Sequence, residues 1–179
     1  ISQIQAAYGP SYRVIGVKAA PGLPWLGTDS IHCRVNAIPV LKPQGSTTEN
    51  LALNQPATAS ETYSSSYPAS AAVDGDTSTR WVSPALSSSN RTQWLSVDLE
   101  RAQTVKRVKL VWSTTNYPTA WSLQYLSGST WSTAYASTSG GGGTQEFTFP
   151  ATAAQQWRIL ATNNAGSYYT LYEFQLFKE

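Results

Sequence analysis

The sequence predicts an all-β fold, an antiparallel β-sandwich, over residues 50–179. Short apolar segments recur about every ten residues between clusters of turn-forming residues, as in sandwiches. No apolar pattern with the helical period is sustained, so no helix longer than one turn is expected. Gly140–Gly143 is expected at a flexible hairpin tip. The predicted strands are 94–99, 105–112, 122–125, 145–149, 157–161 and 171–177.

Composition narrows the class of ligand. Charged residues are 12% of the 179 residues, about half the usual share, and the net charge is only +2. A polar surface with few charges suits neutral ligands such as sugars, and the basic surface of a nucleic-acid-binding protein is missing. No apolar run reaches about 18 residues, so a membrane span is excluded. The chain begins at Ile1 and contains no Met, so we expect a processed product or a fragment.

The chain divides into two unequal pieces, 1–42 and 50–179, joined by a linker at 43–49 that is rich in polar and turn-forming residues. The first piece has strand-type segments at 12–17 and 31–35, and two strands cannot form a stable unit alone. It also carries Cys33, the single cysteine, which excludes an internal disulfide. Cys33 is either a reactive thiol or a buried small apolar side chain, and composition favours the second.

An acidic, glycine-containing loop at 71–81 indicates a cation site. Asp74, Asp76 and Thr79 supply side-chain oxygens at short spacing, and Gly75 permits a tight wrap of the backbone. The loop lacks the closing glutamate of a helix-loop-helix calcium site, so a structural loop site is the better interpretation. The alternative is an acidic turn without metal, because Asp, Gly and Thr are common in turns.

Tryptophans and polar loop residues indicate a sugar site. Trp94, Trp131 and Trp157 are expected inside the sandwich, whereas Trp81 and Trp112 end a strand or loop and could present a ring to a pyranose. Each polar candidate has an alternative: a tyrosine could be loop cover or core, and an arginine could be a solvated charge. The polar candidates in the predicted loops are Glu61, Tyr63, Arg80, Asn116, Tyr117, Asn163, Asn164, Tyr168 and Tyr169.

Residues 50–179 resemble the discoidin, or coagulation-factor type C, domain in its bacterial form as a family 32 carbohydrate-binding module. The resemblance is carried by the opening Asn50-Leu51-Ala52, the loop at 72–81, the segment at 93–99, Trp112 before a loop containing Tyr117, and the closing 172–174. It implies a jelly-roll β-sandwich of the galactose-binding-like type, a structural calcium ion, and glycan contacts from loops at one end.

The resemblance also implies site residues. The calcium ion would be held by the side chains of Asp74 and Thr79, the backbone carbonyls of Ala71 and Asp76, and Glu173 of the last strand. Glu173 lies in an otherwise apolar run, where an unpaired carboxylate would be costly. The sequence departs from many relatives at Ser113, where they carry a glutamate. The implied ligand residues are Arg80, Trp112, Asn116, Tyr117, Asn164 and Tyr169.

Residues 25–34 resemble the C-terminal catalytic segment of bacterial peptidyl-arginine deiminases, so 1–42 would be a two-strand remnant of their α/β guanidino-modifying domain. Cys33 would correspond to the nucleophile, whose thiolate attacks the guanidinium carbon. The two aspartates and the histidine that this family also needs are absent from the chain. His32 neighbours Cys33 in an extended run and would point to the opposite face. The chain alone is therefore not expected to be catalytic.

Together these features predict a non-catalytic carbohydrate-binding module that targets a secreted, extracellular bacterial enzyme to a glycan or polysaccharide. The alternative is the C-terminal fragment of a peptidyl-arginine deiminase, active only with its upstream catalytic portion as partner. A third use of the discoidin fold is insertion of apolar loop tips into membranes. It is disfavoured because the expected tips are mainly Ser, Thr, Asn and Tyr.

Overall fold

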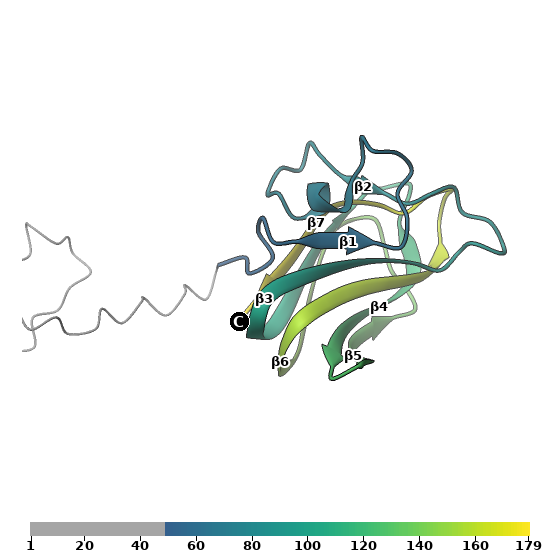
Figure 1. Cartoon of the computed structure of the whole chain (residues 1–179). Coiled ribbons are helices and arrows are strands. Elements are labelled where there is room, and N and C mark those ends of the chain that lie inside the picture. Colours follow the sequence, from purple (N-terminus) through teal and green to yellow (C-terminus); the bar gives the residue numbers. More distant parts are fainter. Residues whose placement is uncertain (1–48) are drawn as a thin grey trace, which may run out of the picture. The chain divides into compact units, whose positions relative to one another are not determined.

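The computed structural model describes residues 49–179, which form an all-β fold with one short 3-10 helix, η1 (Ala69–Ala72) (Figure 1). The predicted fold class is confirmed. The expectations for the remnant at 1–42, for Cys33 and for the linker up to residue 48 lie outside the described residues. The strands are β1 (Ala57–Ala59), β2 (Trp81–Val82), β3 (Gln93–Trp112), β4 (Pro118–Ser127), β5 (Thr130–Ser137), β6 (Gly143–Asn164) and β7 (Thr170–Phe177).

The two longest strands, β3 and β6, pair antiparallel and belong to both layers of the sandwich (Figure 1). The first half of β3 pairs with β1 and with the second half of β6, next to β4 and β5. The second half of β3 pairs with β7 and with the first half of β6, and β2 lies at the outer edge of β7. Four of the six predicted strands are therefore the halves of two continuous strands.

Strand β3 changes layer at Glu100, whose φ of 62° lies in the left-handed region that non-glycine residues rarely adopt. The backbone N–H of Glu100 donates to Oδ1 of Asp98 at 2.8 Å, which supports the turn locally. The pairing register with β6 shifts between Asp98 and Gln103 and again between Val105 and Arg107. These irregularities let one strand serve both layers, because bulges bend a strand and increase its twist.

The core lies between the two layers and follows the alternation of side chains along each strand. Leu95, Val97 and Leu99 of β3 are buried in turn, and after the second register shift the buried positions become Val108, Leu110 and Trp112. Across the layers, the Phe147 ring of β6 lies 5.3 Å from the Trp121 ring of β4, centroid to centroid.

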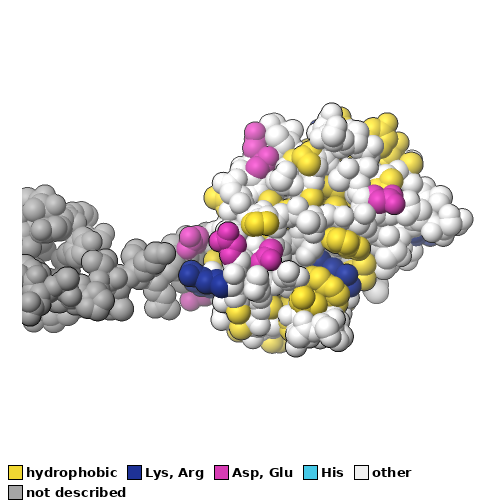
Figure 2. Space-filling model, viewed as in Figure 1, with side chains coloured by type: hydrophobic (Ala, Val, Ile, Leu, Met, Phe, Trp, Pro, Cys, Tyr) yellow, Lys and Arg dark blue, Asp and Glu magenta, His cyan; other side chains and the backbone are white. Residues whose placement is uncertain are grey.

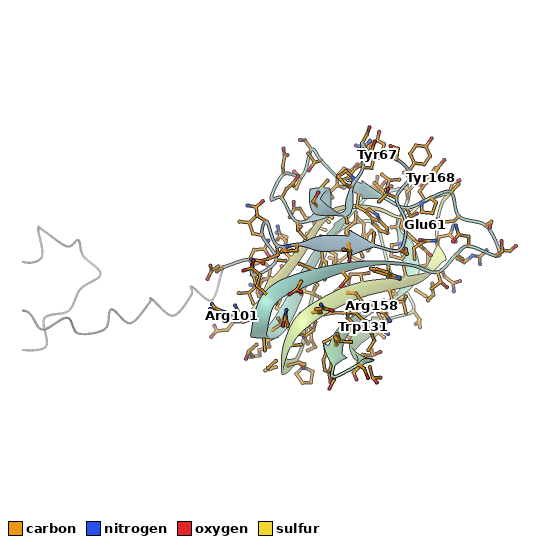
Figure 3. The ribbon with its side chains drawn as sticks, viewed as in Figure 1. Glu61, Tyr67, Arg101, Trp131, Arg158 and Tyr168 are labelled. Atoms are coloured by element: carbon orange, nitrogen blue, oxygen red, sulfur yellow. The ribbon has the colours of Figure 1, made fainter. Side chains whose placement is uncertain are left out.

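The tryptophan predictions are confirmed in part. Trp157 is fully buried, as expected. Trp94 and Trp131 are only half-buried. The Trp131 ring carries the Arg158 guanidinium at 4.2 Å, and both residues are labelled in Figure 3. The side chain of Arg158 also donates from Nε to Oε1 of Gln124 at 2.8 Å.

The glycine segment before β6 is packed rather than a free hairpin tip. The backbone N–H of Gly140 donates to the Thr119 carbonyl at 2.8 Å. A Cβ at Gly142 would come within 2.6 Å of the Ser113 carbonyl oxygen. A glycine is required at position 142 because the segment there lies directly against the backbone of the loop that follows β3. Within residues 49–179, no helix is long and apolar enough to cross a membrane.

Candidate functional site

Loops at one end of the sandwich surround a hollow of about 340 Å³, which we call the tyrosine pocket. Its residues come from the β1–β2 segment, β2 itself, the β3–β4 loop, the β6–β7 loop and the start of β7. Figure 3 labels Tyr67 and Tyr168 at this end, and Figure 2 shows a surface with few charged side chains. The lining residues are Tyr63, Tyr67, Arg80, Val82, Ser113, Asn116, Tyr168, Thr170 and Tyr172.

Three tyrosine rings form one wall of the pocket. The Tyr63 and Tyr168 rings meet edge to face, with centroids 5.5 Å apart and an interplanar angle of 89°. The Tyr67 ring lies 6.2 Å from that of Tyr63. Tyr63 is 56% exposed, a large fraction for an aromatic side chain. This wall offers ring surface to a ligand without any rearrangement of the core.

Arg80 packs against two tyrosine rings of the pocket, Tyr67 from this wall and Tyr172 from β7. Its guanidinium carbon is 4.9 Å from the centroid of Tyr67 and 5.9 Å from that of Tyr172, which holds the group by cation–π attraction. Within the described part of the chain, the single ion pair joins Arg107 to Glu146, and Arg80 has no hydrogen-bond acceptor. Its N–H donors therefore remain available to a ligand.

A β-bulge turns Tyr172 into the pocket. In the pairing of β3 with β7, Val111 lies opposite Glu173 and Trp112 lies opposite Leu171, so Tyr172 is the extra, unpaired residue. Its two neighbours Leu171 and Glu173 are fully buried, whereas Tyr172 is half-buried and lines the hollow. Bulges often re-aim a side chain at a functional site in this way.

Asn116 links the two loops on the opposite side. Its side-chain Oδ1 accepts from the Ser167 N–H at 3.2 Å, and its backbone carbonyl accepts from the Thr170 N–H at 3.0 Å. Gly166 has a φ of 154°, and a Cβ there would come within 2.6 Å of Asn116 Oδ1. A glycine at this position therefore allows the two loops to approach closely.

The structure corrects two of the six implied ligand residues. Trp112 is 2% exposed and Tyr169 is fully buried, so neither ring can stack on a sugar. Both belong to the core, because the alternation along β3 and the entry into β7 point them inward. The Tyr169 hydroxyl donates to the Arg91 carbonyl at 2.8 Å, and burial raises the pKa of Tyr169 to about 12 although the Arg91 charge opposes the shift.

Of the other four implied ligand residues, two line the pocket and two stabilise the loops beside it. Arg80 and Asn116 line the pocket. Tyr117 packs against the core, and Asn164 donates to the Gly166 carbonyl at the end of β6. Trp81, the other proposed platform, is 1% exposed.

Tyr67 and Tyr172 line the tyrosine pocket but were not among the ligand residues predicted from the sequence. The signal for Tyr67 was its position after Tyr63 in a serine-rich loop, whereas Tyr172 was marked only as part of the closing family segment 172–174.

All five residues expected to hold a cation meet beside the pocket, and we call them the oxygen cluster: Ala71, Asp74, Asp76, Thr79 and Glu173. Thr79 Oγ1 lies 2.7 Å from Asp74 Oδ2, 2.9 Å from the Asp76 carbonyl oxygen and 3.2 Å from the Ala71 carbonyl oxygen. A hydroxyl has one proton to donate, so it cannot satisfy three acceptors at once. This excess of acceptors favours a cation.

Glu173 adds a buried carboxylate to the cluster. It is fully buried, and its Oε1 atom has no hydrogen-bond partner. Burial raises the pKa of Glu173, the Gln175 side chain and the Gly75 N–H lower it, and the Asp74 carboxylate raises it further.

No group of three His, Cys, Asp or Glu side chains suited to a metal exists within 49–179, so the cluster depends on backbone and hydroxyl oxygens as well as two carboxylates. Such an all-oxygen set fits Ca²⁺.

Comparison with known proteins identifies relatives of the described domain. The profile of the F5/8 type C domain matches residues 56–174. Chitosan-binding module 1 of a chitosanase/glucanase from Paenibacillus sp. IK-5 is 39% identical, with a TM-score of 0.66 over 72% of this chain and 98% of that module. Module 2 of the same enzyme, solved with chitotriose, is 40% identical, with a TM-score of 0.65 over 72% of this chain and 99% of that module.

A more distant structure shares the fold. The family 32 carbohydrate-binding module of NanJ from C. perfringens, solved with galactose, is 21% identical, with a TM-score of 0.61 over 69% of this chain and 93% of that module.

Proposed function

The chain belongs to the F5/8 type C domain family, and from this premise we propose that residues 49–179 are a carbohydrate-binding module whose tyrosine pocket holds a glycan. The observation that carries the proposal is the wall of Tyr63, Tyr67 and Tyr168 beside the free donors of Arg80. Support comes from relatives that share 39% and 40% identity with this chain and bind chitosan and chitotriose.

Binding would be reversible and would need no chemistry. A pyranose ring presents a face of C–H groups and a rim of hydroxyls, which match an aromatic surface and a few fixed polar groups. Tyr63, with its exposed ring, would take the C–H face. The guanidinium of Arg80 and the polar side chains of Ser113 and Asn116 line the same hollow and would bind the hydroxyls.

We further propose that the oxygen cluster holds a structural Ca²⁺ ion. The ion would neutralise the carboxylates of Asp74 and Glu173 and would be bound by the hydroxyl of Thr79 and the carbonyls of Ala71 and Asp76. It would join the 71–79 loop to strand β7 and so stabilise the folded state.

The biological role we propose is targeting: the module would bring a secreted, extracellular enzyme to polysaccharide. Support comes from the Paenibacillus relatives, which are modules of a chitosanase/glucanase. The deiminase resemblance, with Cys33 as nucleophile, lies outside both the described residues and the matched range 56–174, and it stays a prediction.

A glycan array probed with the full chain tests the proposal. We expect binding to at least one glycan class, lost in Tyr63→Ala and kept in Trp131→Ala, which removes a half-buried aromatic ring outside the pocket. Both variants should keep the circular dichroism spectrum of the parent. If no glycan on the array bound, glycan binding would be contradicted. If only Trp131→Ala lost binding, the glycan site would lie at the β5 edge instead of in the tyrosine pocket.

A further inference from the structure

The tyrosine pocket has an unbalanced charge. Among the nine residues that line it, Arg80 is charged and the other eight are tyrosine, valine or neutral polar residues. Ser113 lies in this lining and contributes a hydroxyl. A ligand in the pocket therefore meets one positive charge and no carboxylate from the lining.

Arg80 differs from the other two arginines that lie over aromatic rings. Arg107 is paired with Glu146, and Arg158 donates to Gln124. Arg80 lies over Tyr67 and Tyr172 without an acceptor among residues 49–179. Two rings hold its position while its planar set of N–H donors stays free, which is a preorganised arrangement for a carboxylate.

The acidic residues closest to Arg80 along the chain, Asp76 and Asp74, do not line the tyrosine pocket. Asp74 and Arg80 both line the adjacent hollow of about 610 Å³, where the two Asp74 oxygens accept from the Asp76 N–H and the Thr79 hydroxyl. Glu61 is exposed and does not line the tyrosine pocket, where its neighbour Tyr63 forms the wall. Asp74, Asp76 and Glu61 form no ion pair with Arg80 among residues 49–179.

We propose that the tyrosine pocket selects acidic glycans, whose sugar carboxylate pairs with Arg80, and discriminates against cationic amino sugars such as those of chitosan. This inference rests on the proposed glycan binding and specifies its ligand class. A protonated amine placed in the pocket would face the uncompensated charge of Arg80 and find no carboxylate in the lining. Specificity then arises from repulsion of the wrong sugar as well as from attraction of the right one.

The test uses three β-1,4-linked trisaccharides that share a backbone and differ in charge. Chitotriose is cationic, cellotriose is neutral, and the trimer of β-1,4-linked glucuronic acid is anionic. We expect titration calorimetry on the full chain at low ionic strength to rank the anionic trimer tightest and chitotriose weakest. Each step in the ranking should be roughly two- to fivefold, the range of exposed ion pairs, and should shrink as salt is added.

Matched variants separate the effect of the Arg80 charge on binding from nonspecific effects of substitution on the fold. Arg80→Gln should remove the difference between the anionic and neutral trimers. Arg158→Gln, which alters an arginine–aromatic stack outside the pocket, should preserve it. Ser113→Glu places a carboxylate in the lining and should tighten the binding of chitotriose relative to the other two trimers. Glu61→Gln should leave the ranking unchanged.

The outcomes are distinguishable. Tightest binding of chitotriose, or a ranking that survives Arg80→Gln, overturns the charge selectivity while glycan binding stands. A ranking that depends on Glu61 also overturns the selectivity, because the charge that matters would then lie outside the pocket. Failure of all three trimers and of the array overturns both proposals.

Discussion

The guanidinium carbon of Arg80 lies 5.9 Å from the ring centroid of Tyr172, and each residue is the sequence neighbour of a member of the oxygen cluster. Thr79 precedes Arg80, and Glu173 follows Tyr172. The two groups that face each other in the pocket are thus attached to the two segments that the cluster brings together. The geometry of the pocket depends on that junction.

Removal of calcium should therefore weaken glycan binding. Without the ion, repulsion between Asp74 and the buried Glu173 should loosen the junction and shift Arg80 away from Tyr172. We expect an affinity loss of about fivefold, the low end of coupling between two sites. Calorimetric titrations in calcium and in excess chelator, at a temperature where circular dichroism shows both forms folded, measure this. Equal affinities would show that the pocket is independent of the cluster.

The metal-free protein should lose stability as the pH rises. Burial raises the pKa of Glu173 above its ordinary value of 4.5, so the folded state binds this proton more tightly than the unfolded chain does. The favourable contribution is full below the ordinary pKa and is lost as the pH rises through the raised pKa. Glu173→Gln should abolish that loss, because the amide carries no charge.

Thermal unfolding between pH 4 and pH 8 tests the Glu173 prediction. In chelator at pH 7, Glu173→Gln should melt above the parent, and added calcium should raise the Tm of the parent alone. Saturating calcium at about 100 times its Kd would add roughly 2.7 kcal/mol to the free energy of unfolding. If calcium left the Tm of the unsubstituted protein unchanged, a structural calcium ion would be excluded.

Trp112→Ala should destabilise the fold rather than act on binding alone. The ring is 2% exposed, and removing a buried tryptophan side chain costs about 3–5 kcal/mol of unfolding free energy. Tyr63→Ala, at a residue that is 56% exposed, should change stability by less than about 0.5 kcal/mol. Urea denaturation of both variants gives the comparison. A Trp112→Ala protein as stable as the parent would place the ring outside the core.

Gly142→Ala should destabilise the protein more than Gly141→Ala. A Cβ at Gly142 would come within 2.6 Å of the Ser113 carbonyl oxygen and 2.7 Å of the Thr114 Cα, and both are backbone atoms. At Gly141 the nearest atom is the end of the Gln145 side chain at 3.0 Å, which can move aside. We expect a cost of about 1–3 kcal/mol for Gly142→Ala, measured by urea denaturation. Equal effects in the two variants would show that the clash is relieved elsewhere.

Local sequence patterns predicted most strands but not their continuity. The predicted strands at 94–99 and 105–112 are both parts of β3, because the chain passes from one layer to the other through Glu100 without ending its pairing. Strand β5 was missed because Thr130–Ser137 is rich in small polar residues and lacks a clear apolar alternation. Its pairing with β4 is a tertiary effect that no local pattern shows.

By itself the sequence determined the all-β class and the resemblance to discoidin domains, because strand alternation and short motifs are local features. The loop pattern predicted Asp74, Asp76 and Thr79 of the oxygen cluster, whereas Ala71 and Glu173 were implied only by the family resemblance. Only the tertiary structure decided which aromatic rings face solvent. Trp112 and Tyr169 follow the inward alternation into the core, whereas a bulge turns Tyr172 outward to meet Arg80. The direction of a side chain at a strand end depends on the register with its neighbour, and register is set by pairing across the sheet.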